Sequence, residues 1–238
     1  MRYDVTTSKK QEFSIEDKKN VSFGYSIANY IFLNEAELFF CGDVNESDKV
    51  ITDTYIYCFF TEELRKRADM NYPRCCHGMT KLGGSAYIFG GESIRGADKI
   101  CEKFNILDNE WTEIEQLPIN GNYAYATTHD NMIFITAQSW DHILQYKPDT
   151  NTYYRTGENI PRNIGKILLS YDNELILMTG NLIKSVDKEE EGFTHKQPFP
   201  WTNTAGVEYK NQVFWMDRYN SIVTYDIAEK KVSRVSSK

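Results

Sequence analysis

A pair of hydrophobic or aromatic residues, seven positions apart and separated by polar residues, recurs along the chain. The first members of the pairs stand at positions 57, 104, 146, 186 and 225, which are 47, 42, 40 and 39 residues apart. The clearest copies run from Phe104 to Trp111 and from Tyr146 to Tyr153. Asp and Asn between the two residues favour a tight turn, because their side chains hydrogen-bond to the nearby backbone. Each copy therefore predicts a strand, a turn and a second strand.

Two more apolar stretches precede each of these pairs. Before Tyr146 they are 124–128 and 133–137, which are joined by a turn containing Asp130 and Asn131. A repeat of roughly 40 residues with four short strands has the size of one β-propeller blade. Helix-pair repeats have a similar length, but the 3.6-residue periodicity of helices is absent. The pattern thus predicts an all-β fold.

We predict a single domain over residues 1–238 with five four-stranded blades. The blades cover approximately 21–74, 75–121, 122–163, 164–204 and 205–238. Residues 1–20 are interpreted as the outer strands of a partial sixth blade, because Tyr3 and Phe13 form a similar pair with a ten-residue spacing. The inner strands of such a blade would lie upstream, in a longer parent protein with flanking domains.

The second repeat resembles a kelch repeat. It combines Gly90-Gly91 at the end of a strand with Phe104 and, seven residues later, Trp111. The kelch pattern is a double glycine, a Tyr or Phe, and a Trp about six residues beyond it; the other repeats keep this spacing with other residues at some positions. The resemblance implies a kelch-like β-propeller. In it the glycines would allow two backbone segments to approach closely, and the aromatic residues would pack between neighbouring blades.

Composition narrows the choice of partners and compartment. With 41% hydrophobic and 14% aromatic residues the chain can bury a large core, whereas a net charge of −7 without a basic stripe disfavours nucleic acid. The N-terminus shows no apolar signal region, and no apolar run reaches the roughly 20 residues that span a bilayer. The five cysteines lack a disulfide framework. We therefore expect no membrane association and a cytoplasmic location, with the nucleus as the alternative.

The resemblance also implies a protein partner, of unknown identity, on one face of the propeller. In a four-stranded blade, the connection from strand two to strand three and the connection to the next blade lie on the same face. Exposed Arg, Tyr and Trp on that face are the residue types enriched in binding hot spots, although each one alone is more commonly an ordinary loop residue. The predicted partner-binding residues are Arg74, Arg95, Trp140, Asp141, Arg162, Arg218 and Tyr219.

We predict no catalytic residue, cofactor or metal ligand. The paired spacing of zinc sites is absent from Cys75, Cys76 and His77, even together with Cys101. In addition, adjacent residues of a strand point to opposite faces, so neighbouring cysteines would not share an ion. The same argument speaks against Asp141-His142 as a catalytic dyad.

The favoured function is therefore a non-catalytic protein–protein interaction scaffold or substrate-recognition module. Two alternatives of other classes remain open. One is a propeller enzyme acting on sugars, either a copper radical oxidase with a Tyr–Cys pair or an epimerase. The other is a structural propeller associated with the cytoskeleton.

Overall fold

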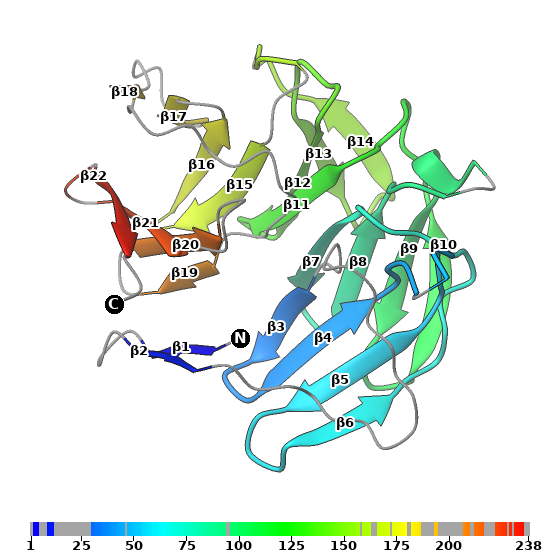
Figure 1. Ribbon diagram of the computed structural model, residues 1–238. Helices are drawn as coiled ribbons and strands as arrows, with labels where there is room; N and C mark the ends of the chain where they lie inside the picture. Colours follow the sequence, from blue (N-terminus) through cyan, green and yellow to red (C-terminus); the bar gives the residue numbers. More distant parts are fainter. Residues whose placement is uncertain are drawn as a thin grey trace.

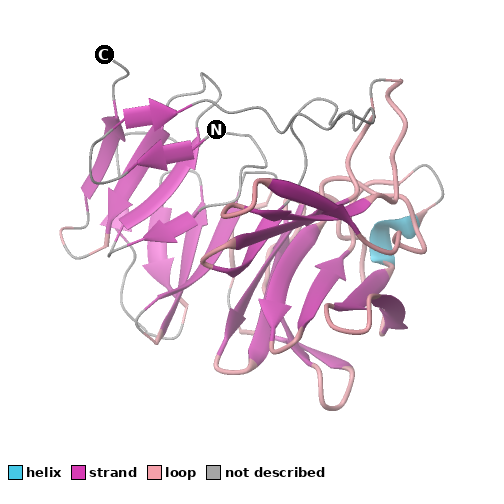
Figure 2. Cartoon of the chain, turned by 90° about the horizontal axis from the view of Figure 1, so that it is seen from below, coloured by secondary structure: helices cyan, strands magenta, loops and turns pink. Residues whose placement is uncertain are grey.

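Short antiparallel strands, arranged in sheets around a central axis, make up nearly all of the regular secondary structure in the described part of the computed structural model (Figure 1). The structure describes residues 2–4, 9–11, 30–45, 47–93, 96–157, 159–162, 166–171, 173–179, 182–186, 193–194, 207–209, 212–216, 222–227, 229 and 231–235. Within them the single helix is a 3₁₀ turn, η1 (Ala97–Lys99), which is visible in Figure 2. This part of the chain contains no helix that is long and apolar enough to cross a membrane.

Among the described residues, five sheets contain four strands each, and in every one of these sheets the strands are neighbours in the sequence. This confirms the predicted all-β propeller. Blade one is β3 (Tyr30–Asn34), β4 (Glu37–Cys41), β5 (Thr54–Cys58) and β6 (Glu63–Lys66); blade two is β7 (Gly78–Leu82), β8 (Ser85–Phe89), β9 (Cys101–Asn105) and β10 (Glu110–Ile114); blade three is β11 (Ala124–His129), β12 (Met132–Ala137), β13 (Leu144–Lys147) and β14 (Thr152–Arg155); blade four is β15 (Lys166–Tyr171), β16 (Glu174–Thr179), β17 (Leu182–Ser185) and β18 (Phe193–Thr194); blade five is β19 (Val207–Tyr209), β20 (Gln212–Met216), β21 (Ile222–Asp226) and β22 (Lys231–Val235).

The first strand of each blade lies nearest the axis, as Figure 1 shows. A separate two-stranded hairpin, β1 (Arg2–Asp4) and β2 (Lys9–Gln11), lies on the side of the ring where blades one and five face each other. The hairpin falls in the segment interpreted as outer strands of a partial sixth blade. Its strands pair Tyr3 with Lys10, and Phe13 lies outside the described residues.

The residues seven positions apart face each other across the third and fourth strands. Phe104 pairs with Trp111, Tyr146 with Tyr153, and the equivalent residues pair in blades one and five. Asn109 and Asn151 in the turns have φ values of 58° and 52°, in the left-handed region that Asn tolerates better than most residues. The repeated pattern therefore corresponds to two residues that pair across the third and fourth strands, which are joined by a tight turn.

Blade four departs from this register. Phe193 pairs with Ile183 instead of Val186, so the sequence-based choice of Val186 as its partner is wrong. The reason is that β17 ends at Ser185, and Val186 already lies in a bend. The distance between the two members of the pair along the chain is consequently longer in this blade.

The apolar core is divided into layers between adjacent blades. Between blades one and two, the ring of Phe39 stacks on Phe104 at a centroid distance of 5.3 Å, and Trp111 packs against Phe104 at 5.0 Å. The indole Nε1 of Trp111 also donates a hydrogen bond to the carbonyl oxygen of Ala68 in the preceding connection, at 2.8 Å. These contacts confirm that the aromatic pair packs between neighbouring blades.

The double glycine lies where two backbone segments come together. Gly90 has a φ of 60°, and a Cβ atom there would lie 2.5 Å from the carbonyl oxygen of Gly121. At Gly91 the φ is 102°, and a Cβ would lie 2.6 Å from the carbonyl oxygen of Cys75. Any side chain at these positions would collide with backbone, which confirms the expected close approach.

Arg74 lies in the interior and not on the surface, so the expectation of an exposed, partner-contacting arginine is wrong here. Its side chain is fully buried and donates hydrogen bonds to the carbonyl oxygen of Gly90 at 2.9 Å and to Glu102 at 2.7 Å. The other carboxylate oxygen of Glu102 accepts two hydrogen bonds from Asn71. The arginine follows Pro73, but the connection turns inward at this point and joins blade one to blade two.

We expect Gly90→Ala to destabilise the fold by about 2 kcal/mol or more, because alanine would carry a positive φ and collide with the Gly121 carbonyl. Urea unfolding followed by tryptophan fluorescence measures the change. Gly84→Ala is the matched control, since its Cβ would meet no atom within 4 Å. Equal stability of the two variants would show that the close approach is unimportant.

Glu102→Gln should cost about 3–5 kcal/mol of folding free energy, because it leaves the buried Arg74 charge without a counter-ion. The double variant Arg74→Met, Glu102→Gln removes both charges and should be more stable than Glu102→Gln alone. Urea titration of the three proteins tests this order. A single variant with the stability of the parent would contradict the buried ion pair.

Candidate partner-binding face

The connections that follow the second and fourth strands meet on one face, as expected. In blade one, the amide of Asp43 donates to the carbonyl oxygen of Arg74 at 3.0 Å. The amide of Gly91 donates to Gly121 at 2.9 Å in blade two, and Ile160 to Asp141 at 2.8 Å in blade three. These bonds confirm the shared face for the first three blades, and we call it the loop face.

Three of the seven predicted partner-binding residues come together on the loop face, namely Trp140, Asp141 and Arg162. They line one cavity, which is formed by the β12–β13 loop, the connection after β10 and the connection after β14. Arg74 lies in the interior, as described above. The remaining three, Arg95, Arg218 and Tyr219, fall outside the described residues.

Asp141 is the centre of the charged network. Its carboxylate accepts hydrogen bonds from Nε of Arg162 at 3.1 Å and from Nη2 of the same guanidinium, while Nη2 of Arg155 lies at 3.3 Å. Nδ1 of His142 is 2.8 Å from Oδ1 of Asp141, the carboxylate oxygen that Arg155 also contacts. The hydrogen bond to His142, followed by the interaction with Arg162, holds the pKa of Asp141 well below its usual value. Asp141 therefore stays ionised and fixes both arginines.

The contact between Asp141 and His142 corrects the prediction that these neighbours face apart. That argument assumed a strand, in which alternate side chains point to opposite faces. Both residues instead lie in the bend before β13, where the alternation does not apply. The two side chains consequently form a hydrogen-bonded pair.

Trp140 supports the loop from below and is not exposed. Only 3% of its surface is accessible, so the expected role as an exposed contact residue is wrong for this side chain. The indole stacks on the imidazole of His142, with centroids 5.3 Å apart and planes at 3°. Its Nε1 donates to the carbonyl oxygen of Asn120 at 2.6 Å. Trp140 thus joins the β12–β13 loop to the connection after β10.

Lys166, which the sequence analysis did not single out, holds the same loop from inside. Its ammonium donates three hydrogen bonds of 2.8 Å to the carbonyl oxygens of Ala137, Gln138 and Trp140. Three acceptors match the three donors of a lysine. Burial lowers the pKa of Lys166 to about 8. A lone lysine in the otherwise apolar run at the start of β15 was the available signal.

The cavity has a volume of about 300 Å³ and opens to solvent. Arg155 and Arg162 form its exposed part, since 62% and 63% of their side-chain surfaces are accessible, against 25% for Asp141. Two guanidinium groups around one carboxylate leave an excess of positive charge. Arg155 was missed because it lies at the end of strand β14. The full lining consists of Ile119, Asn120, Ser139, Trp140, Asp141, His142, Arg155 and Arg162.

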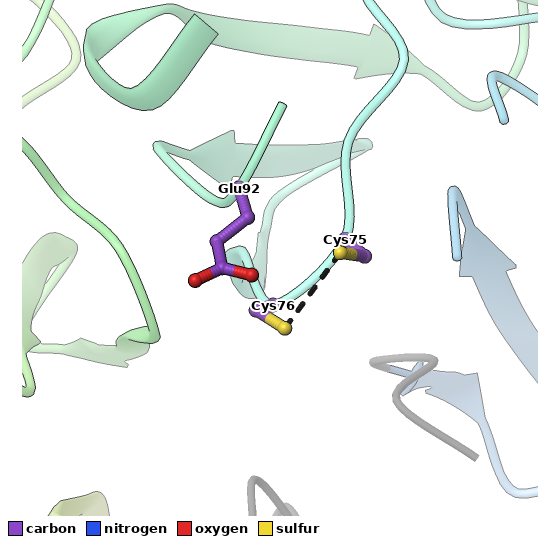
Figure 3. A group of neighbouring side chains, drawn as sticks. All are labelled: Cys75, Cys76 and Glu92. Atoms are coloured by element: carbon purple, nitrogen blue, oxygen red, sulfur yellow. Dashed lines mark hydrogen bonds between the residues drawn. The ribbon is translucent and has the colours of Figure 1, made fainter. Parts of the chain in front are cut away.

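A second cluster lies where the connection from β6 meets the residues after β8. Cys75, Cys76 and Glu92 place their ligand atoms within 4.8 Å of one another (Figure 3). Adjacent cysteines were expected to point apart, but the two Sγ atoms are only 3.7 Å from each other, so that expectation is wrong. His77 and Cys101 are not part of this group of three.

The Tyr–Cys arrangement considered for a copper oxidase has a partial counterpart. The hydroxyl of Tyr153 lies 3.4 Å from Sγ of Cys101. The same hydroxyl donates a shorter hydrogen bond, of 2.7 Å, to the carbonyl oxygen of Glu115. This second bond is equivalent to that of Trp111 in blade two, which indicates that Tyr153 serves the packing between blades.

No protein-family model matches the chain. It is similar to Kelch-like protein 15 from Homo sapiens, Mus musculus and Rattus norvegicus, with 28% identity over 101 residues in each case. The aligned stretch covers 37% of this chain and 17% of each relative's length. The repeated four-stranded blades, the glycine and aromatic positions of blade two, and this similarity support a kelch-repeat β-propeller.

Proposed function

We propose that the chain is a non-catalytic protein-interaction module that binds a partner through the loop face. Similarity to a kelch-like protein supports a protein-interaction role in general. The observation that carries the finer proposal is the pair of exposed arginines, Arg155 and Arg162, which converge on one cavity. An acidic side chain or a chain-terminal carboxylate of the partner would bind there.

The chemistry of the cavity fits a carboxylate. The planar guanidinium group binds carboxylates through two parallel hydrogen bonds, and arginine is enriched in binding hot spots. Asp141 contacts both arginines and holds them in place, yet its single charge leaves one positive charge in excess. The whole chain has a net charge of −7, so this local excess of positive charge would direct an acidic partner segment to the cavity.

The surroundings provide a rigid base for such a contact. Trp140 and Lys166 anchor the β12–β13 loop through the hydrogen bonds described above. The loop therefore loses little conformational entropy when a partner binds. Ile119 is 38% exposed at the edge of the cavity and offers an apolar contact beside the charges. A charged centre with an apolar neighbour is suited to a peptide segment.

The double charge reversal Arg155→Glu, Arg162→Glu should weaken partner capture at least tenfold without unfolding the protein, because the reversed charges would repel an acidic segment. Quantitative affinity capture from cell extract compares the variant with the parent chain. The captured amount should also fall as the salt concentration rises.

The matched control is Lys147→Glu, Lys231→Glu, which changes the net charge equally. Both lysines are exposed and border the turns between strands three and four, on the face opposite to the loop face. The control should retain its partners. Equal loss in both variants would show a general charge effect, and unchanged capture in the arginine variant would reject this cavity as the binding site.

A further inference from the structure

Cys75 and Cys76 form a pair of neighbouring thiols close to the carboxylate of Glu92 (Figure 3). Cys75 and Cys76 are buried, whereas Glu92 is partly exposed. All three ligand atoms lie within 4.8 Å of one another. The group belongs to the loop face but contains none of the residues that line the arginine cavity.

The backbone explains why two adjacent side chains converge. Cys76 has a φ of 53°, a left-handed conformation that ends the alternation of an extended segment. Cys75 and Glu92 exchange two backbone hydrogen bonds, of 3.0 and 2.7 Å, which hold the two segments together. Gly91 permits this approach, since any Cβ there would collide with the Cys75 carbonyl. The geometry is therefore set by the fold and needs no ligand to assemble it.

The spacing of the sulfur atoms suits a tetrahedral ion. Two thiolates at about 2.3 Å from Zn²⁺ lie roughly 3.8 Å apart when the angle between them is tetrahedral. The observed distance between the Sγ atoms of Cys75 and Cys76 is 3.7 Å. A carboxylate is the usual third kind of zinc ligand beside Cys and His. A carboxylate oxygen of Glu92 lies within 4.8 Å of both sulfur atoms, so a shift of this partly exposed side chain would bring it into the same coordination sphere.

The charges around the thiols also favour a cation. Glu92 and Asp43 both act electrostatically on the two cysteines. A cation would be attracted by these two carboxylates.

We propose that Cys75, Cys76 and Glu92 bind one Zn²⁺ ion, with the fourth position taken by water. On binding, two S–H bonds break, two S–Zn bonds form, and the two protons pass to solvent. The ion would tie the connection before blade two to the segment after β8. Blade three lies next to it, because the amide of Ala124 donates to the carbonyl oxygen of Cys76 at 3.2 Å.

The test is a titration of the fully reduced protein with Cd²⁺ alone, followed by the thiolate-to-cadmium charge-transfer absorption. We expect one equivalent to bind, competition by Zn²⁺, and tighter binding at higher pH because protons are released. Cys75→Ser and Cys76→Ser should each lower the affinity at least a hundredfold, and Glu92→Gln roughly tenfold.

Cys58→Ser is the matched control. Of the five cysteines, all of which the structure describes, Cys58 alone is not buried, so it is the most accessible thiol for unspecific binding. This variant should bind Cd²⁺ as the parent does. Loss of binding in Cys58→Ser, or parental affinity in Cys75→Ser and Cys76→Ser, would overturn the proposal.

A measurement on the unaltered protein covers the case in which a cysteine variant does not fold. The ¹¹³Cd NMR chemical shift reports how many sulfur atoms bind the ion, and two are expected. A shift typical of an all-oxygen site or of a single sulfur ligand would reject the thiol pair. Absence of stoichiometric binding to the reduced protein would do the same.

Discussion

The contact between the outer aromatic pair of one blade and the blade before it is the interaction on which the ring depends. In blade two, Phe104 and Trp111 pack against Phe39, and the indole hydrogen-bonds to the preceding connection. In blade three, Tyr146 and Tyr153 take the same positions. Trp and Tyr are interchangeable here because both combine a large apolar ring with a hydrogen-bond donor that reaches a backbone carbonyl.

This packing between blades forms the loop face. When one blade is docked on the next, the connections after strands two and four come within hydrogen-bond distance of each other. The inner glycines make the approach possible, since Gly90 and Gly91 leave no room for a side chain. Buried charges then secure the connections: Arg74 joins blades one and two, and Lys166 holds the loop of blade three. The binding cavity is thus a consequence of how the core is built.

Both corrections to the predicted chemistry share one cause. Cys75-Cys76 and Asp141-His142 were judged as strand neighbours with side chains on opposite faces, but Cys76, Asp141 and His142 lie in bends, and Cys75 belongs only to an isolated β-bridge. A left-handed φ at Cys76 and a bend at Asp141 place the adjacent side chains close together. The alternation rule holds only for extended backbone, and short repeats place many residues outside it. Whether two adjacent side chains in a propeller connection can act together therefore depends on the backbone conformation of that connection.

The sequence by itself determined the four-stranded repeats and the order of their strands, the cross-strand pairs in four of the five repeats, and the close backbone approach at Gly90-Gly91. These features depend on local patterns, because apolar periodicity, turn residues and glycines act over a few positions. It also led to Trp140, Asp141 and Arg162. Tertiary structure alone decided that Trp140 and Arg74 are buried, that Arg155 joins the cavity, and that Glu92 meets the two thiols. Those outcomes arise from contacts between residues far apart in the chain, whose burial and pairing are set only when blades dock against one another.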